Sequence, residues 1–429
     1  MNKESNVAAW VALSLALGPR SPRLKRLLAH FHTPEAVLAA SREEVLSVLP
    51  DIGKGALSAL CYQRQEKEVA RILSYCGKRG VKLLTPDMAE YPASLFAISE
   101  PPAVLYCLGD LSWLSKAPLV GVVGARENDA YGARMAYKLS FELAASGAVV
   151  VGGLANGIDG IAAAAAIDAG AATVGVLGCG IDRVYPKHHT RLYSEVAERG
   201  VILTEYAPGT RPFSWNFPVR NRIISALSEA LVVVQANERS GALITARYAL
   251  LQGKPLFAVP GDADNPRSVG ANMLLRAGAL MATAGEDVLS HFRFLYRDAL
   301  DMHVPAEALQ YTGVTEEKLK AHGVRLIGKK KEESEGIGAG QRRVKTAQEN
   351  DEHRSSAPSP MESEALASLS ESDRKVYEAL PDAPFTVDLL VAKGIAPRDA
   401  VSAMTLFEIL ALVRSMPGGT YQKTAGSGS

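Results

Sequence analysis

The feature that most constrains the fold is the apolar run Leu119–Val123, which is followed by Gly124-Ala125-Arg126. An uninterrupted apolar run of this length is typical of a strand buried on both faces of a parallel sheet. Apolar residues four apart then predict a helix over 131–143, and a second apolar run over 148–151 ends in Gly152-Gly153. This pattern is a βαβ unit, and α/β sheets bind ligands at the carboxyl ends of such strands. We therefore expect the functional site at that edge.

The alternation of apolar runs and helical patterns continues to about residue 295. Regular alternation of this kind predicts an α/β fold with an extended Rossmann-like, doubly wound, mainly parallel sheet over residues 80–295. The remaining predicted strands cover 173–178, 201–204, 230–235, 256–259 and 280–282. The remaining predicted helices cover 158–169, 190–199, 222–228, 241–252 and 271–277.

Residues 1–75 predict a separate helical domain. Ser41 and Glu44 are spaced as in a capping box. The segment Leu49–Leu57 carries Gly53-Lys54-Gly55 and resembles the turn of a helix-hairpin-helix module, so the domain is predicted to be SAM- or helix-hairpin-helix-like. For a lone Gly-x-Gly we favour a tight turn between helices over a phosphate site. The predicted helices cover 7–17, 22–31, 34–40, 42–48 and 54–74.

Two further parts follow the predicted sheet. Residues 301–365 mix charged residues with Gly, Ser and Pro and lack apolar periodicity, which predicts a flexible linker that adds no packing. Residues 366–425 predict a winged-helix-like domain, a fold that often binds duplex DNA through a helix. Its third helix carries Asp399 and Glu408 and few cations, so a protein-contacting role is at least as well supported. The predicted elements are helices at 372–380, 386–393 and 398–411 and strands at 412–414 and 420–422.

Net charge and cysteine spacing narrow the range of functions. A formal net charge of +1 means that any nucleic-acid site must be a local group of cations. The four cysteines form no CxxC pair, no zinc spacing and no disulfide framework. The apolar stretch Val7–Leu17 is too short to span a bilayer. We therefore expect a cytoplasmic protein with no metal, no cofactor and no membrane contact.

Glycine and arginine recur in the loops that follow the predicted strands. Glycine lets backbone amides approach an anion closely, and arginine makes bidentate contacts to phosphate. Each glycine alone could serve turn geometry, but their recurrence at successive strand ends predicts a phosphate-rich ligand. We expect Arg126, Arg220 and Arg222 to line one groove. The loops contain Gly124-Ala125-Arg126, Gly152–Asp159, Gly178–Asp182, Phe217–Arg222, Glu238–Gly241 and Pro260-Gly261-Asp262.

Two enzyme classes fit these residues poorly. Gly121-x-x-Gly124 is not the G-x-G-x-x-G dinucleotide fingerprint, and the second strand ends in Gly152-Gly153 where a ribose-binding acid belongs. No G-x-S-x-G elbow occurs, and His188-His189 alone form no triad. Asp159 follows a loop and is expected to cap the helix that starts there. The residues alone therefore give weak support to dinucleotide-dependent and to hydrolytic chemistry.

Taken together, these motifs resemble the DNA-processing protein A family (DprA, also named Smf) over residues 119–290. The resemblance implies a homodimer that binds single-stranded DNA without catalysis. It further implies loading of a RecA-type recombinase onto DNA taken up in natural transformation. The motifs that carry it are Val122–Arg126 with Tyr131-Gly132, Gly153–Asp159, Gly178–Asp182 with Tyr185-Pro186, Thr204-Glu205-Tyr206, Phe217–Ile224, Ser240–Ala246 and Val259-Pro260-Gly261. The residues expected to contact DNA or phosphate are Gly124, Arg126, Gly153, Asn156, Gly157, Lys187, Arg220, Asn221, Arg222, Ser240 and Gly241.

The chain departs from the family's pattern at four positions. Gly152 and Asn156 replace the serine and the arginine of the family's Ser-Gly-Leu-Ala-Arg-Gly-Ile-Asp. Ala163 stands where histidine is frequent, and Gln235 stands where glutamate is common. A neutral Asn156 should weaken phosphate binding, because charge-assisted hydrogen bonds are the stronger ones. Alternatively, Asn156 only suits a left-handed turn before Gly157.

A hypothesis of a different class stays open beside DNA binding. Related Rossmann-like folds include phosphoribohydrolases, so the chain could be an enzyme or sensor for a nucleotide-derived small ligand. Those enzymes use Pro-Gly-Gly-x-Gly-Thr-x-x-Glu, which Pro260-Gly261-Asp262 does not supply.

Overall fold

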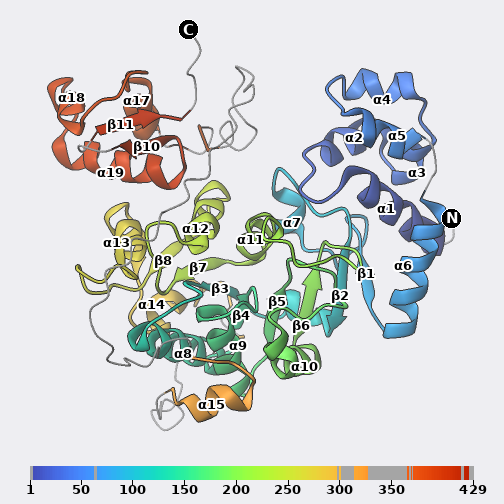
Figure 1. Cartoon of the computed structure of the whole chain (residues 1–429), viewed down its shortest axis with the longest axis horizontal. Helices are drawn as coiled ribbons and strands as arrows, with labels where there is room; N and C mark the ends of the chain where they lie inside the picture. The colour runs from blue at the N-terminus through green and yellow to red at the C-terminus, as the bar shows by residue number, and fades with distance from the viewer. Residues whose placement is uncertain are drawn as a thin grey trace, which may run out of the picture. The chain divides into compact units, whose positions relative to one another are not determined.

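A nine-stranded sheet runs through the first part of the chain (Figure 1). Its strands are β1 (Lys82–Leu84), β2 (Leu105–Gly109), β3 (Leu119–Val123), β4 (Val149–Gly152), β5 (Thr173–Val176), β6 (Val201–Thr204), β7 (Ala230–Val233), β8 (Leu256–Ala258) and β9 (Leu280–Met281). The order is β1-β2-β6-β5-β4-β3-β7-β8-β9. The β1–β2 and β2–β6 pairs are antiparallel and all other neighbours are parallel. The predicted mainly parallel, doubly wound α/β sheet is therefore confirmed.

The structure is a computed structural model that describes residues 3–61, 65–296, 299–300, 314–326, 365–366, 369, 371–416 and 420–424. Residues Met1–Leu326 form one unit and Ile327–Ser429 form another. The domain boundaries near residues 75–80, 295–301 and 365–366 stay predictions.

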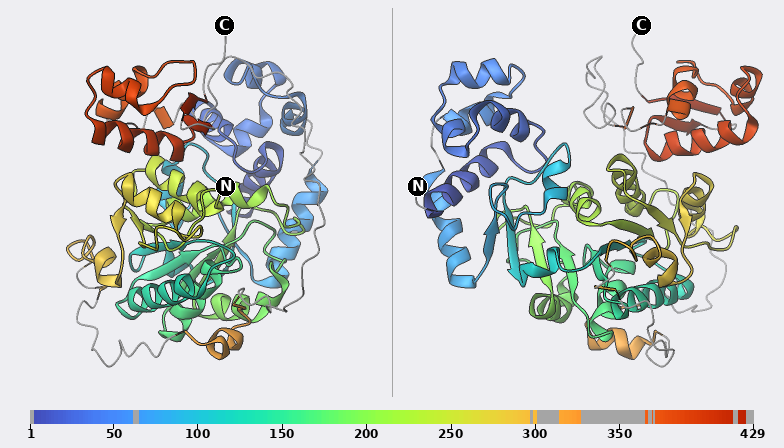
Figure 2. Two further views of the ribbon diagram at one scale, coloured as in Figure 1. Left: turned by 60° about the vertical axis from the view of Figure 1, so that its left-hand side comes forward. Right: turned by 180° about the vertical axis from the view of Figure 1, so that it is seen from behind.

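Helices cover both faces of the sheet. They are α7 (Ala93–Ala97), α8 (Ala130–Ala145), α9 (Ile158–Asp168), α10 (Thr190–Arg199), α11 (Asn216–Leu227), α12 (Gly241–Leu251), α13 (Val269–Arg276) and α14 (Gly285–Leu289), with single turns η1 (Leu111–Leu114) and η2 (Lys187–His189). Helices α8, α9 and α10 lie on one face and α11, α12 and α13 on the other (Figures 1 and 2). Every residue of β3 to β7 is buried, as expected for strands covered on both sides.

Helix α11 begins at Asn216, earlier than the predicted start at residue 222. Pro218 suggests a helix break and so places the predicted start too late. In the structure Pro218 lies in the first turn of α11, where a proline loses no intrahelical hydrogen bond. Phe217, Arg220 and Asn221 therefore belong to the beginning of a helix and not to a loop. This shift decides which side chains reach the edge of the sheet.

The described residues before the sheet form helices α1 (Lys3–Leu17), α2 (Arg23–Phe31), α3 (Pro34–Ala39), α4 (Arg42–Val48), α5 (Lys54–Cys61) and α6 (Glu66–Arg79). The predicted capping box is confirmed, because Ser41 Oγ accepts from the Glu44 amide and Glu44 Oε2 accepts from the Ser41 amide. The single helix predicted over 54–74 is wrong: α5 ends at Cys61 and α6 begins at Glu66. Residues 62–64 lie outside the described part. Apolar side chains of these helices share a core with Val104 and Tyr106.

The second unit contains helices α17 (Glu371–Glu378), α18 (Val387–Ala392) and α19 (Pro397–Ile409) and strands β10 (Val413–Met416) and β11 (Thr420–Lys423). The two strands pair antiparallel, with Val413 opposite Lys423. Buried Phe407 of α19 meets Tyr377 edge to face at 5.4 Å between ring centroids. The predicted elements are therefore present, while the winged-helix assignment and its partner stay predictions.

Residues 314–326 fall in the range predicted as a flexible linker, yet they pack on the sheet domain. They include helix α15 (Glu316–Ala321), whose Leu319 is fully buried, and Val324, which is 1% exposed. Both side chains belong to the main core cluster. The prediction of no packing is wrong for this segment, because Leu319 and Val324 stand five residues apart and match neither the helix nor the strand period. Most of the remaining predicted linker lies outside the described residues.

His322 ties this segment to the domain through two carboxylates. Its Nε2 lies 2.9 Å from Asp168 Oδ1 of α9, and its Nδ1 lies 2.6 Å from Glu195 Oε2 of α10. Hydrogen bonding to Asp168 and Glu195 raises the pKa of His322 above its usual 6.5, although burial opposes the shift. Burial by itself raises the pKa of Asp168. Hydrogen bonds from His322 and Tyr137 outweigh burial, so the pKa of Asp168 lies below its usual value. Both shifts favour the charged pair.

We expect this contact to stabilise the protein in a pH-dependent way. Because the pKa of His322 is higher in the folded than in the unfolded protein, protonated His322 stabilises the fold. This stabilisation is complete below about pH 6.5, the unfolded pKa, and is lost as the pH rises through the folded-state pKa. Melting temperatures of the wild type and His322→Gln should therefore differ most below about pH 6.5 and converge as the pH rises through the raised folded-state pKa of His322. Parallel curves at all these pH values would contradict the assignment. Tyr137→Phe, which leaves both His322 contacts in place, is the matched control.

Candidate functional site

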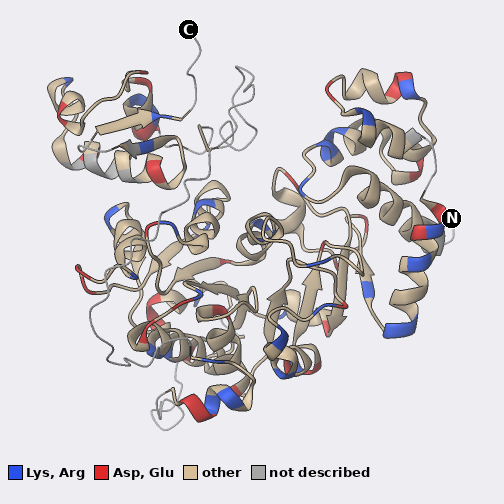
Figure 3. Cartoon of the chain, viewed as in Figure 1, with Lys and Arg blue, Asp and Glu red and all other residues tan. Residues whose placement is uncertain are grey.

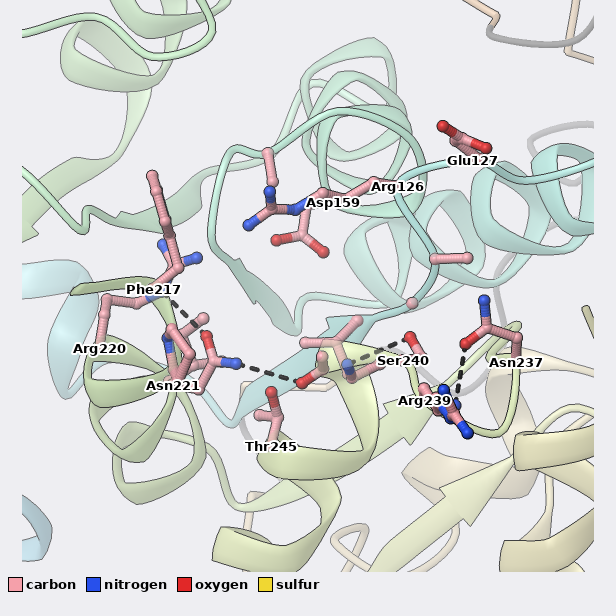
Figure 4. Close-up of a pocket in the computed structure, with 18 of the residues that line it drawn as sticks. Arg126, Glu127, Asp159, Phe217, Arg220, Asn221, Asn237, Arg239, Ser240 and Thr245 are labelled. Atoms are coloured by element: carbon pink, nitrogen blue, oxygen red, sulfur yellow. Dashed lines mark hydrogen bonds between the residues drawn. The ribbon is translucent and has the colours of Figure 1, made fainter. Parts of the chain in front are cut away.

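A polar cavity of about 370 Å³ lies at the carboxyl edge of the sheet beside β3, where the strand order reverses (Figure 4). Its wall comes from the loops after β3 and β4, the start of α11, and the loop that leads into α12. Doubly wound sheets bind their ligands at this position. Its charged and polar lining residues are Arg126, Glu127, Asp159, Ser214, Arg220, Asn221, Asn237, Arg239, Ser240 and Thr245.

Two glycines allow the loops after β3 and β4 to touch. Gly157 has φ of 75°, and a Cβ there would collide with the carbonyl oxygens of Ala125 and Arg126. A Cβ at Gly124 would lie 2.6 Å from Cγ1 of Ile158, whose amide donates to the Ala125 carbonyl at 3.2 Å. These glycines therefore fix the backbone that carries Arg126, and Gly124 also lines the cavity.

The loop after β4 is also held by His189 of η2. His189 is fully buried, and burial lowers its pKa to about 4, so the ring is neutral. Its Nδ1 donates to the Leu154 carbonyl at 3.1 Å, an atom that can only accept. Leu154 has φ of 51° and Gly157 of 75°, whereas Asn156 is not left-handed. The alternative interpretation of Asn156 as a left-handed turn residue is therefore wrong.

Arg220 is built into the cavity wall. The residue is 3% exposed, and its Nη1 donates to the carbonyls of Gly153 (3.0 Å) and Val176. Its Nε donates to Asn221 Oδ1 at 3.1 Å. Any side chain at Gly153 would collide with this guanidinium, so the glycine makes room for it. Burial lowers the pKa of Arg220. The guanidinium of Arg220 lines the cavity, but its Nε and Nη1 already donate hydrogen bonds within the protein.

Asp159 lies next to this guanidinium and does not cap α9 as predicted. The N-cap is Gly157, which has no side-chain cap, and Asp159 Oδ2 accepts from the Gly153 amide at 2.9 Å. Burial raises the pKa of Asp159, while Arg220 and Arg126 act in the opposite direction. The carboxylate therefore holds the strand end of β4 against the start of α9.

Two exposed arginines supply the available positive charge. Arg126 and Arg239 both line the cavity and are exposed. The guanidinium carbon of Arg126 lies 5.0 Å from the ring centre of Phe217, a cation–π distance. Phe217 also packs against half-exposed Tyr185 at 5.2 Å. Exposed cations beside aromatic rings form a surface that can bind phosphates and bases together.

The first turn of α12 also lines the cavity. Ser240 is its N-cap and accepts from the Ala242 amide at 3.3 Å, and Gly241 is the first helical residue. Asn221 Nδ2 donates to the Gly241 carbonyl at 3.3 Å and so joins α11 to α12. The N-terminus of an eleven-residue helix carries partial positive charge, which favours an anion.

Arg222 does not line this cavity, which corrects the prediction of one groove formed by three arginines. It is 1% exposed and forms a bidentate ion pair with Glu205, both contacts at 2.7 Å. Its Nε donates to the Glu100 carbonyl at 3.1 Å. The role of Arg222 is therefore structural.

Four other predicted residues lie outside the cavity lining, namely Gly153, Asn156, Gly157 and Lys187. Lys187 is exposed on η2, and its carbonyl accepts from Thr190 Oγ1 at 2.8 Å. Asn156 is half-buried, next to the lining residue Ala155. Their contact with a ligand stays a prediction.

Sequence reasoning missed Phe217 and Arg239 as site residues. Both stand inside motifs that were recognised, Phe-Pro-x-Arg-Asn-Arg and the residues before Ser240-Gly241. Their position in those motifs was the available signal. Across the described ranges, no group of three or more His, Cys, Asp or Glu is placed to hold a metal ion, and no helix is long and apolar enough to cross a membrane.

The fold and the cavity define a doubly wound α/β protein with an arginine-bearing polar pocket at the switch point of its sheet. Residues 82–293 match the family model described as DNA recombination-mediator protein A. The chain belongs to this family.

Relatives support the assignment over different lengths. The DNA processing protein DprA of Bacillus subtilis is 41% identical over 221 residues, which cover 52% of this chain and 74% of that protein. Protein Smf of Synechocystis is 32% identical over 423 residues, 98% of this chain and 99% of that protein. The X-ray structure of DprA from Streptococcus pneumoniae superposes with a TM-score of 0.59 at 30% identity, covering 65% of this chain and 95% of that one.

Proposed function

We propose that this chain binds single-stranded DNA at the cavity beside β3. The observation that carries the proposal is that exposed Arg126 and Arg239 face one concave site together with the first turn of α12. Lys and Arg are otherwise distributed over many elements and mixed with Asp and Glu (Figure 3). Duplex DNA is read by an element inserted into a groove, whereas a single backbone can follow cations into a concave site.

The test is a competition assay with the full chain and a fluorescent single-stranded oligomer. We expect unlabelled single strand to compete far better than duplex of the same length, and free nucleotides to compete only weakly, because each occupies a single phosphate position. Effective competition by a mononucleotide would instead favour the alternative, a site for a nucleotide-derived small ligand.

We further propose that the chain acts as a homodimer in the cytoplasm, without catalysis, and loads a RecA-type recombinase onto single-stranded DNA during natural transformation. The family's description as a recombination mediator supports the recombinase. Edge strand β9 presents Leu280 (41% exposed) and Met281 (59% exposed), the kind of edge that pairs with a second chain. Sedimentation equilibrium tests the dimer. Displacement of single-strand-binding protein by the recombinase, with and without this chain, tests the loading.

Restoring the family's arginine at position 156 should strengthen binding. Asn156 adjoins the cavity wall and is half-buried, so an arginine there can reach a phosphate next to those bound in the cavity. Asn156→Arg should steepen the slope of log affinity against log salt by about 0.7. The matched control is Asn156→Gln, which lengthens the side chain without charge. Equal affinities for both variants would show that the loop does not face DNA.

A further inference from the structure

Two aromatic rings stand exposed in the loop before α11. Phe213 is 42% exposed and Trp215 is 65% exposed, and their rings stack at 4.6 Å between centroids with planes 7° apart. The other tryptophans differ: Trp10 is 2% exposed and Trp113 is only partly exposed. A stacked pair left in water does not contribute to the core, so its apolar faces are available to a ligand.

The loop that carries the pair is fixed in place. Asn216, which is 5% exposed, donates from Nδ2 to the carbonyls of Gly178 (3.0 Å) and Arg211 (3.3 Å). The Asn216 carbonyl accepts from Tyr206 Oη at 3.2 Å, and the Asn216 backbone amide donates to the Phe213 carbonyl at 3.0 Å. The rings are thus held by a buried anchor, which lowers the entropy that a ligand must overcome on binding.

The aromatic pair adjoins the anion site. Ser214, which stands between the two rings in sequence, lines the cavity. Phe217 also lines it, and the guanidinium of Arg126 lies over the Phe217 ring. A nucleic-acid strand alternates charged phosphates with flat bases. A backbone in the cavity therefore brings its bases towards the rim, where exposed aromatic faces can stack on them.

We propose that Phe213 and Trp215 form a base-stacking platform for single-stranded DNA whose backbone lies in the cavity. This inference rests on the proposed function and adds to it a second, uncharged determinant of binding. Stacking on such a platform tolerates any base, because every base has a π face.

The test compares two oligomers of equal length and charge, oligo-dT and an abasic strand, on the full chain. The wild type should bind oligo-dT more tightly. Trp215→Ala should weaken oligo-dT binding about 5- to 150-fold, the range found for base-stacking aromatics, and leave abasic binding and the salt slope unchanged. Trp215→Phe should retain most of the affinity. Oligo-dT should also quench the fluorescence of the exposed Trp215 indole.

Controls separate this inference from the proposed function. Phe294→Ala removes a ring that is 73% exposed. Phe294 is close in sequence to Tyr296, which donates to Glu229 at the amino end of β7, the end opposite the cavity. This substitution should leave the affinity for both oligomers unchanged. Arg126→Ala should weaken both oligomers. If Trp215→Ala binds oligo-dT as the wild type does while Arg126→Ala is impaired, the platform is wrong and DNA binding stands. If the wild type binds neither oligomer, both proposals fail.

Discussion

Replacing Arg222 with alanine is expected to destabilise the protein by about 3–5 kcal/mol, the cost of breaking a buried ion pair from one side. Arg222 and Glu205 are 1% and 7% exposed and are joined by two hydrogen bonds of 2.7 Å. Truncation leaves the Glu205 carboxylate buried without a cation. Lysine should also fail, because its single ammonium cannot reproduce the bidentate contact. Chemical denaturation of both variants measures the loss.

A paired substitution provides the control for Arg222. Arg222→Met combined with Glu205→Leu removes both charges and should recover most of the stability, because an apolar pair of similar volume can replace a buried ion pair. Under conditions where Arg222→Ala stays folded, its salt slope for DNA should match the wild type, since Arg222 lies outside the cavity lining. A stable Arg222→Ala protein with a reduced salt slope would show that Arg222 contacts DNA phosphate after all.

Affinity for single-stranded DNA is expected to fall about 7-fold between roughly 50 and 200 mM salt, if about two phosphates are neutralised with a slope near 0.7 each. These two contacts would come from exposed Arg126 and Arg239. Arg126→Ala should reduce the slope by about 0.7, because one fewer counterion is released.

The matched control for Arg126 is Arg293→Ala. Arg293 is exposed and lies over an aromatic ring, 4.7 Å from the centre of Phe294, as Arg126 lies over Phe217. It does not line the cavity. The slope of Arg293→Ala should equal that of the wild type. A flat salt response of the wild type, or equal effects of the two substitutions, would contradict the proposed phosphate site.

Apolar runs in the sequence were enough to predict strands β3 to β9, whereas no range was predicted for β1 or β2. Strands β3 to β7 are buried on both faces and must be apolar at nearly every position, so the signal is local and strong. Glycine-rich strand ends likewise predicted where the polar cavity lies, because parallel strands bring their carboxyl ends to one edge. The start of α11 was predicted too late, since Pro218 reads as a break unless it stands in the first turn.

Tertiary structure alone decided the roles of individual side chains. Arg220 and Arg222 stand two residues apart in one motif, yet on a helix they point about 200° apart. One therefore faces Gly153 and the cavity, and the other faces Glu205 in the interior. Leu319 and Val324 are buried only because helices from distant parts of the chain form a surface to receive them. Burial and pairing depend on the partner surface, which the local sequence does not contain.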